Sequence, residues 1–387
     1  MKLQIEKILY KLEKHLRTTG FKGYDPYDIL NCKFISKKVH NTKILLILTQ
    51  LNRISPLNFR QLLEVKKIYN SKAMTLFLSA KLCQNNLKGE NNELIQFIIQ
   101  WLIDNKSKTY KQYSIGFTHD IALEHYYSPK DYPSLIITLF VMYPFIEYYK
   151  RTIDKNVLNH ILSFQELVEQ ELPQFEDDST LWYSYNFEKV NEIYNATAKI
   201  GKFYSLLYPI TKDKALLIKI EKILNYLAKK QRDDGSWAYG ENISYTDGFH
   251  TAFVLEAIWY MRKVLDNPKI NEMFYKGLEH YKKYLFKSNG QPLYFHPNYK
   301  PKDIRRFLIE TDIRDCAMAI VFFSIIGENE IANKVLEWTL GNMYNNKKGY
   351  FYYFKNRLFT NKIEFIRWQA WMLYALSVYN KEVGPNK

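Results

Sequence analysis

A unit made of a polar turn and aromatic residues recurs in the second half of the chain, and it constrains the fold most strongly. The four copies are "DDSTLWYSYN" (177–186), "DDGSWAYG" (233–240), "SNGQPLYFH" (288–296) and "NKKGYFYYF" (346–354). Asp-Gly and Asn-Gly favour turns because glycine accepts a positive φ without steric cost. Gly235, Gly290 and Gly349 lie 55 and 59 residues apart. Such a period suits a helix hairpin with its two connections.

The segments around these turns alternate between two helical patterns. Residues 213–230, 269–286 and 328–343 each have one apolar stripe and one charged face, which is typical of surface helices. The intervening segments, residues 247–260, 309–324 and 362–377, are apolar nearly all round, as buried helices are. This alternation predicts an all-α fold, an α/α toroid in the form of an (α/α)6-like barrel of inner and outer helices. An α-solenoid is the alternative, because the pattern does not define whether the ring closes.

The whole chain, residues 1–387, is predicted to form a single toroid domain. Residues 176–387 contain the clear hairpin repeats, whereas residues 1–175 are expected to form less regular hairpins of the same ring. Strand patterns are restricted to short aromatic stretches such as residues 350–354, which predict small β-hairpins at one rim.

The predicted inner helices begin with a carboxylate that is followed three positions later by a second polar residue. The pairs are Asp247/His250, Asp312/Asp315, Glu364/Arg367 and Glu192/Asn195. Residues three apart share one helix face, and the first turn favours acidic side chains through the helix dipole. Each carboxylate could therefore be only an N-terminal cap. Four such pairs at equivalent positions favour a site at the mouth of the ring where the inner helices begin.

This site is expected to bind and process a sugar. Asp247, His250, Asp312 and Asp315 are the candidate catalytic acids and bases. Arg367, with Arg314 and Arg53 as further candidates, could hold a sugar carboxylate in a guanidinium fork. The remaining candidates for substrate binding are the stacking residues Trp237, Tyr239, Tyr294 and Trp368, together with Glu364 and Asn195.

Composition narrows the choice of partner. The net charge of +15 favours an anionic ligand, but no basic run or zinc-finger spacing indicates nucleic acid. The three cysteines are far apart and predict neither a disulfide framework nor a cysteine metal site. His119–Asp120 and Glu124–His125 resemble metal ligands but lack a matching third ligand, so neither a metal nor another cofactor is predicted. No signal peptide or membrane-spanning run is evident, which favours a cytoplasmic protein.

Gln231–Trp237 reads Q-x-x-x-G-x-W and resembles the repeat element of terpenoid cyclases and related toroids. In that family the element ties helix ends together, which implies structural roles for Gln231, Gly235 and Trp237. The acid motif D-x-D-D of the cyclases is missing, because "TDIRDCA" has only Asp312 and Asp315 in D-x-x-D spacing. The zinc ligand set of the protein prenyltransferases is not reproduced either. Isoprenoid chemistry is therefore the weakest alternative.

A second resemblance extends over nearly the whole chain. Segments such as "GYDPYDIL", "QLNRISPLNFRQLL", "YNATAKIG", "DGFHTAFVLEAI" and "IRWQAWMLYAL" are similar to a family of bacterial and archaeal proteins encoded among polysaccharide and capsule biosynthesis genes. The chain departs from that family at residues 114–127 and 311–320, and these departures put activity in doubt if the family uses those positions.

The resemblance implies a role in polysaccharide biosynthesis. The expected function is action on an acidic glycan or its precursor as a hydrolase, lyase or uronyl epimerase. The alternative is a glycan-binding or scaffold protein without catalysis.

Overall fold

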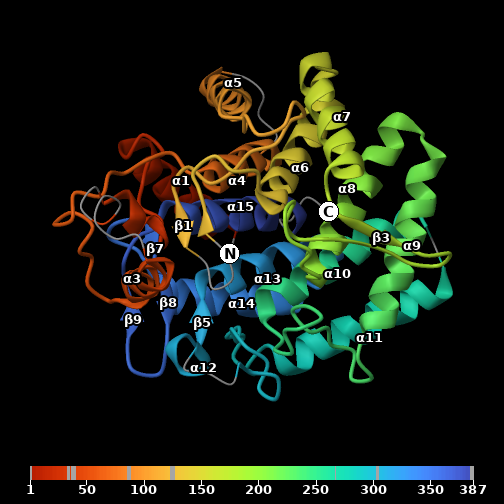
Figure 1. The fold of residues 1–387 in the computed structure, drawn as a ribbon. Helices are drawn as coiled ribbons and strands as arrows, with labels where there is room; N and C mark the ends of the chain where they lie inside the picture. Colours follow the sequence, from red (N-terminus) through yellow and green to blue (C-terminus); the bar gives the residue numbers. More distant parts are fainter. Residues whose placement is uncertain are drawn as a thin grey trace.

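Six of the described helices form a closed inner ring in the computed structural model, which describes residues 2–32, 35, 41–84, 89–122, 127–265, 267–301 and 305–383. These helices are α4 (Ser71–Cys83), α6 (Leu135–Thr152), α8 (Tyr194–Thr211), α10 (Gly248–Arg262), α13 (Ile313–Ile326) and α15 (Ile366–Glu382). Each one packs against the next, and α15 packs against α4 (Figure 1). The ring therefore closes, which confirms the α/α toroid and excludes the solenoid, whose end helices do not meet.

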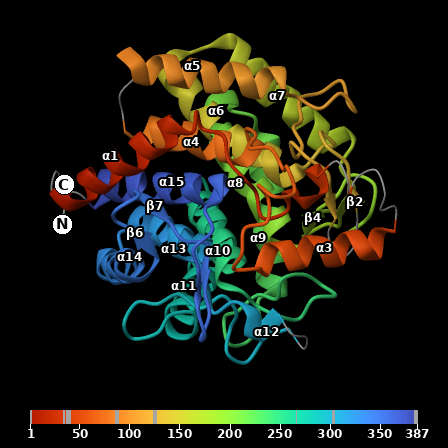
Figure 2. The same ribbon diagram turned by 90° about the vertical axis from the view of Figure 1, so that its left-hand side faces the viewer.

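An outer helix covers each inner helix. The outer helices are α1 (Lys2–Thr18), α5 (Gly89–Asp104), α7 (Lys155–Gln170), α9 (Lys214–Lys230), α11 (Pro268–Tyr284) and α14 (Asn329–Met343). The N-terminal helix α1 packs on the C-terminal helix α15 and so completes the outer layer (Figure 2). The helices predicted from the striped and apolar patterns are confirmed, and α13 begins four residues later than expected because Thr311–Asp312 forms strand β5.

Burial follows the sequence patterns that predict these layers. Helix α13 buries nearly every residue from Ile313 to Ser324, because it is surrounded by other helices. Helix α9 instead buries residues at helical spacing on one face, among them Leu216, Ile220 and Leu224. The main hydrophobic core contains residues from Ile5 of α1 to Tyr379 of α15 and so includes side chains of both ends of the described chain.

The two ends of the ring differ in the length of their connections. Inner helices lead to outer helices through short turns such as residues 153–154 and 212–213. Outer helices return to inner helices through long segments, and all described strands lie in them. These are the hairpins β1 (Ile121–Ala122)–β2 (Tyr127–Ser128), β3 (Gln174–Glu176)–β4 (Leu181–Tyr183) and β6 (Tyr344–Asn345)–β7 (Tyr350–Phe351), and the sheet of β5 (Thr311–Asp312), β8 (Phe354–Lys355) and β9 (Thr360–Asn361). The strands thus gather at the rim where the inner helices begin, as predicted.

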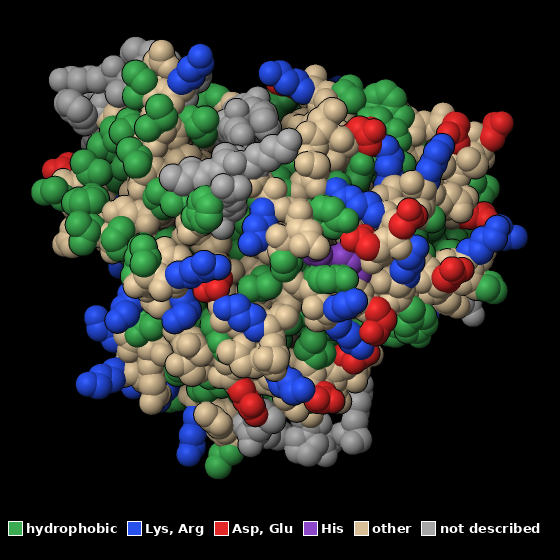
Figure 3. All heavy atoms as spheres, turned by 90° about the horizontal axis from the view of Figure 1, so that it is seen from below, with side chains coloured by type: hydrophobic (Ala, Val, Ile, Leu, Met, Phe, Trp, Pro, Cys, Tyr) green, Lys and Arg blue, Asp and Glu red, His purple; other side chains and the backbone are tan. Residues whose placement is uncertain are grey.

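The first long connection contains η1 (Asp28–Asn31) and α3 (Thr42–Ile54), and α12 (Arg305–Leu308) lies in a later one. Helix α3 turns Gln50 and Arg53 toward this rim and exposes Ile44, Ile47 and Leu51 on another face. Figure 3 shows hydrophobic side chains gathered at the upper left, the side on which α3 lies in Figure 1, while Lys and Arg are scattered among acidic residues. Among the described residues, no helix has the length and apolar character needed to cross a membrane.

The recurring glycine turns hold the outer layer together. Gly235 and Gly290 have φ of +89° and +85°, which confirms the positive φ predicted for Gly235. A Cβ atom on Gly235 would lie 2.5 Å from the main-chain oxygen of Lys276 in α11. A Cβ atom on Gly290 would lie 2.4 Å from the main-chain oxygen of Lys334 in α14. Gln231 donates hydrogen bonds to the main-chain oxygens of Gly235 and Met273 at 2.9 and 3.0 Å. This geometry supports a structural role for the turn.

Candidate functional site

A carboxylate and an imidazole form a close pair at the start of α10. Asp247 is the N-cap residue, and its Oδ1 accepts a hydrogen bond from the His250 main-chain N–H at 2.7 Å. Its Oδ2 lies 2.7 Å from Nδ1 of the His250 ring. Asp247 is buried, whereas the His250 side chain is 29% exposed. Because Asp247 engages Nδ1, the ring nitrogen Nε2 remains for a ligand.

Three side chains predicted to bind substrate surround this pair. Tyr239 packs edge-on against the His250 ring with centroids 4.6 Å apart, and burial raises the pKa of the Tyr239 hydroxyl well above its ordinary value. Asn195 at the start of α8 is buried, and its side-chain Nδ2 forms no hydrogen bond with the described residues. Trp237 also borders this small pocket but is anchored away from it, because its Nε1 donates to the Leu227 main-chain oxygen.

A second group of side chains lies where α13 and α15 begin. Asp312 is the N-cap of α13. The guanidinium of Arg314 donates hydrogen bonds to its carboxylate from Nε at 3.0 Å and from Nη2 at 2.9 Å. Trp368 of α15 donates its indole Nε1–H to Asp312 Oδ1 at 2.9 Å. Arg314 also lies over the rings of Phe249 and Trp368, at 5.1 and 4.8 Å from their centroids. Asp312 therefore has both a capping role and a role in ordering this arginine.

A third ion pair joins the first long connection to α15. Arg367 contacts Asp25 through Nη2 and Nε, each at 3.1 Å from a carboxylate oxygen. Asn70, the N-cap of α4, donates to the same carboxylate at 3.0 Å. Asp25 also accepts a hydrogen bond from the Tyr27 main-chain N–H at 3.0 Å, which forms an Asx turn around Pro26.

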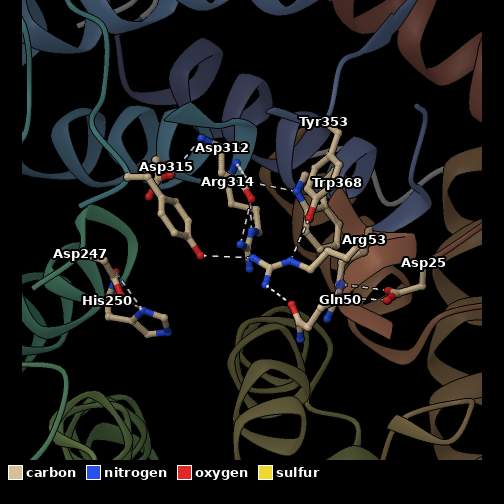
Figure 4. Close-up of polar contacts among 12 residues, drawn as sticks. Asp25, Gln50, Arg53, Asp247, His250, Asp312, Arg314, Asp315, Tyr353 and Trp368 are labelled. Atoms are coloured by element: carbon tan, nitrogen blue, oxygen red, sulfur yellow. Dashed lines mark hydrogen bonds and ion pairs between the residues drawn. The ribbon is translucent and has the colours of Figure 1, made fainter. Parts of the chain in front are cut away.

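Arg53 differs from the other arginines of this rim because its partners are neutral. Its guanidinium donates to the Tyr353 hydroxyl at 3.1 Å, the Gln50 side-chain oxygen at 3.2 Å and the Tyr294 hydroxyl at 3.4 Å. Figure 4 shows this network beside Asp312 and Arg314, with the Asp247–His250 pair set apart from it. Of the described residues, no carboxylate forms an ion pair with Arg53. We refer to these groups together as the rim site, which comprises Asp25, Arg53, Asp247, His250, Asp312, Arg314 and Arg367 with the aromatic rings that contact them.

Several predicted residues lie outside the open part of the rim site: Asp312, Trp368 and Trp237 are fully buried, as is Asp315, and Glu364 turns away from the site. Asp315 is buried, and one of its oxygens completes a capping box with the Asp312 main-chain N–H. Burial, reinforced by the Asp312 carboxylate, raises the pKa of Asp315 well above its ordinary value. Glu364 precedes α15, whose N-cap is Phe365, and turns outward to His15 of α1 at 2.8 Å. Glu364 therefore does not occupy the N-cap position that Asp247 and Asp312 occupy in their helices, and it does not face the rim site with Arg367.

The two residues of the fourth predicted pair, Glu192 and Asn195, face different parts of the molecule. Asn195 enters the pocket beside His250, but Glu192 accepts a hydrogen bond from Tyr226 and pairs with Lys230 of α9. Gln50, Asn70 and Tyr353 join the rim site without a sequence signal, because each comes from a different connection or helix start.

Metal ligation was not predicted for this chain. Among the described residues, no three His, Cys, Asp or Glu side chains are arranged to hold a metal ion. His119 is buried with Nε2 at 3.8 Å from Asp25, and burial lowers the pKa of its imidazole. Glu124 and His125 lie outside the described residues.

No protein-family model and no curated protein matches this sequence. Solved structures of similar fold are numerous, and three illustrate them. A cellobiose 2-epimerase from Bacillus thermoamylovorans B4167 has a TM-score of 0.60 at 15% identity and covers 81% of this chain and 90% of its own. A polysaccharide lyase has a TM-score of 0.62 at 10% identity, covering 100% and 99%. A family 76 glycoside hydrolase from a bovine Bacteroides thetaiotaomicron strain has a TM-score of 0.58 at 11% identity, covering 80% and 68%.

These likenesses show that the chain shares an α/α-toroid fold with carbohydrate-active enzymes. At 10–15% identity they carry the fold alone, so the assignment of function depends on the rim site.

Proposed function

We propose that the protein is a glycan-processing enzyme that acts on an acidic oligosaccharide or polysaccharide precursor at the rim site. The observation that carries the proposal is the buried carboxylate of Asp247 held against a partly exposed imidazole, His250, at the mouth of a toroid. A carboxylate on Nδ1 fixes the imidazole tautomer and stabilises its protonated form, so that Nε2 can give or take a proton. The solved toroids named above include an epimerase, a lyase and a hydrolase, each of which processes a carbohydrate.

Arg53 supports an acidic substrate. Arg314 and Arg367 are each neutralised by a carboxylate, whereas the hydrogen-bond partners of Arg53 among the described residues are hydroxyl and amide oxygens. A partly buried guanidinium without a counter-ion is stabilised by an anionic ligand, and its planar fork matches a sugar carboxylate. Tyr294, which already orients this guanidinium and is only partly buried, also offers a face on which a sugar ring can stack.

A glycan-binding protein without catalysis is the second candidate. The bidentate Asp312–Arg314 pair and the Asp25–Arg367 pair favour it, because ion pairs of this kind can hold loops in place without chemistry. A cyclase acting on an apolar isoprenoid is disfavoured by the number of charged groups in the rim site. A role in polysaccharide biosynthesis rests on the resemblance of the sequence to proteins encoded among such genes.

The proposal is tested by incubating the protein with acidic and neutral oligosaccharides in heavy water, with trigalacturonate and cellotriose as the reference pair. Mass spectrometry then distinguishes cleavage from deuterium uptake. We expect turnover of acidic sugars by the wild type and a loss of about 100-fold or more in His250→Ala, the usual contribution of one acid/base group. His15→Ala is the matched control, because His15 is partly exposed but pairs with Glu364 outside the rim site. Equal rates in His250→Ala and the wild type would contradict the assignment.

A further inference from the structure

A lysine without a polar partner lies beside the rim site. Lys72 is the second residue of α4 and is partly buried. Among the described residues its amine forms no hydrogen bond and no ion pair. It contacts aromatic rings instead, lying 4.1 Å from the centroid of Phe140, 5.6 Å from Trp371 and 6.0 Å from Phe249. An ammonium ion over aromatic rings is attracted by their faces, but among the described residues this one has no counter-ion.

Further positive groups surround this amine. Lys199 of α8 is fully buried without a hydrogen bond and lies over the same Phe140 ring at 4.2 Å. Arg314 shares the Phe249 ring with Lys72, at 5.1 Å from its centroid. Burial, followed by the charges of Arg367, Lys199 and Arg314, lowers the pKa of Lys72 well below its ordinary value, and Asp25 opposes this only in part. The arrangement therefore favours an uncharged amine, which is a base.

Aromatic rings connect Lys72 with His250. Trp371 contacts Phe140 and Phe249 with ring centroids 5.5 and 5.4 Å apart, and the Phe249 ring lies 5.4 Å from that of His250. Lys72 lies over the Phe140 ring of this group, and His250 contacts the Phe249 ring. Two groups able to transfer a proton thus contact one connected set of aromatic rings, and Arg314 lies over Phe249, one of these rings.

The carboxylates of the rim site are engaged by other groups. Asp247 is held by His250, Asp312 by Arg314 and Trp368, and Asp25 by Arg367. Hydrolysis of a glycosidic bond normally requires two carboxylates that flank it, one to protonate the leaving oxygen and one to attack or to activate water. The described rim site offers no such pair. Removal of a proton from carbon requires instead a base and a cation that stabilises the resulting negative charge.

We propose that the Lys72 amine is the base that takes the proton from the carbon bonded to the carboxylate of an acidic sugar. This inference rests on the proposed function and names its first chemical step. The C–H bond breaks, its proton forms a new N–H bond on Lys72, and its electron pair delocalises into the carboxylate held by Arg53. His250 in its protonated form then returns a proton to the opposite face of that carbon, which inverts it. Alternatively, it protonates the neighbouring glycosidic oxygen as its C–O bond breaks, the delocalised electron pair forms a C=C bond, and the leaving sugar departs with a free hydroxyl. Water afterwards takes the proton from Lys72 and restores that of His250.

Two measurements test this inference, and the first requires no sugar. Trace acetylation of the wild-type protein from pH 6.5 to 11, followed by peptide mass spectrometry, gives the titration of each lysine. We expect Lys72 to reach half of its maximal reactivity at a lower pH than the exposed Lys347, because Arg367, Lys199 and Arg314 face its amine. Half-maximal reactivity of Lys72 at or above the pH of Lys347 would overturn the inference.

The second measurement follows carbon-bound deuterium in trigalacturonate and related acidic oligosaccharides in heavy water. We expect Lys72→Met to lose about 100-fold or more of the rate while it binds the sugar as the wild type does. Lys72→Arg introduces a guanidinium that stays protonated and supplies no base at neutral pH, so it is expected to fail equally. Exchange within about threefold of the wild type in Lys72→Met overturns the inference. Hydrolysis by the wild type without carbon exchange overturns it while leaving the proposed function intact, whereas no turnover of any acidic glycan refutes both.

Discussion

Two glycines with the same backbone conformation but different surroundings allow a controlled test of the fold. Gly235 and Gly327 have φ of +89° and +82°, so alanine is strained at both positions. A Cβ atom on Gly327, the C-cap of α13, would meet no atom within 4 Å, whereas one on Gly235 would lie 2.5 Å from the Lys276 main-chain oxygen. That oxygen belongs to α11 and cannot rotate away as a side chain could.

The expected losses of stability have two causes, the left-handed backbone conformation at both glycines and the close contact of the new Cβ atom at Gly235. A left-handed conformation costs an L-residue about 1–2 kcal/mol, which is the whole expected effect of Gly327→Ala. Forcing an extra carbon into a packed contact adds about 1–3 kcal/mol, so Gly235→Ala is expected to lose about 2–5 kcal/mol. With about 2.1 cal/mol/K per residue, a chain of 387 residues has an unfolding entropy of about 0.8 kcal/mol/K. The expected decreases in Tm are therefore about 1–2.5 °C for Gly327→Ala and about 2.5–6 °C for Gly235→Ala.

Calorimetry and urea unfolding of both variants beside the wild type measure these differences. The reasoning fails if the two variants lose the same stability, because the contact with α11 would then have no cost. It also fails if Gly327→Ala is the more damaging substitution.

Three further predictions concern buried polar groups. Glu256→Gln leaves the buried Lys202 ammonium without its carboxylate at 2.8 Å and is expected to cost about 3–5 kcal/mol in urea unfolding. The control Glu330→Gln, in an exposed pair with Lys334, is expected to leave the free energy of unfolding nearly unchanged. The raised pKa of Asp315 means that its bound proton stabilises the folded state below pH 3.8 and that this contribution is lost as the pH rises. The free energy of unfolding of the wild type relative to Asp315→Asn is therefore expected to fall above about pH 4, and a pH-independent difference would contradict this. Gln231→Ala removes two hydrogen bonds and is expected to lower the Tm without weakening glycan binding, while unchanged melting with lost binding would make Gln231 a functional residue.

The layers of this fold were accessible from the sequence because they depend on local patterns. A helix that is buried on one face has apolar residues at helical spacing, which places α9 in the outer layer. A helix that is buried on all sides is apolar nearly throughout, which places α13 in the inner layer. The caps at Asp247 and Asp312 follow from the preference of helix N-termini for carboxylates. Glu364 was assigned to the same register, but α15 begins two residues after it, and the side chain turns to α1 instead.

The rest of the rim site depends on contacts between distant segments. Arg367 meets Asp25 across 342 residues, and Arg53 meets Tyr353 across 300. No spacing within one segment can encode such pairs, because they arise only when α15 packs against α4 and closes the ring. Lys72 was missed for a related reason. A lysine near a helix start is ordinarily solvated, and only the surrounding rings and arginines make this one unusual.

The central claim is that the rim site binds an acidic sugar through Arg53, and a direct test is calorimetric titration of trigalacturonate. Arg53→Gln keeps a hydrogen-bonding side chain but removes the charge, and Lys347→Gln removes one exposed charge away from the rim site. A hydrogen bond to a charged group contributes about 1.5–3 kcal/mol, so we expect Arg53→Gln to weaken binding by about 10- to 150-fold. Lys347→Gln is expected to bind as the wild type does, and cellotriose to bind far more weakly than trigalacturonate. Equal affinity of Arg53→Gln and the wild type for trigalacturonate would contradict the account.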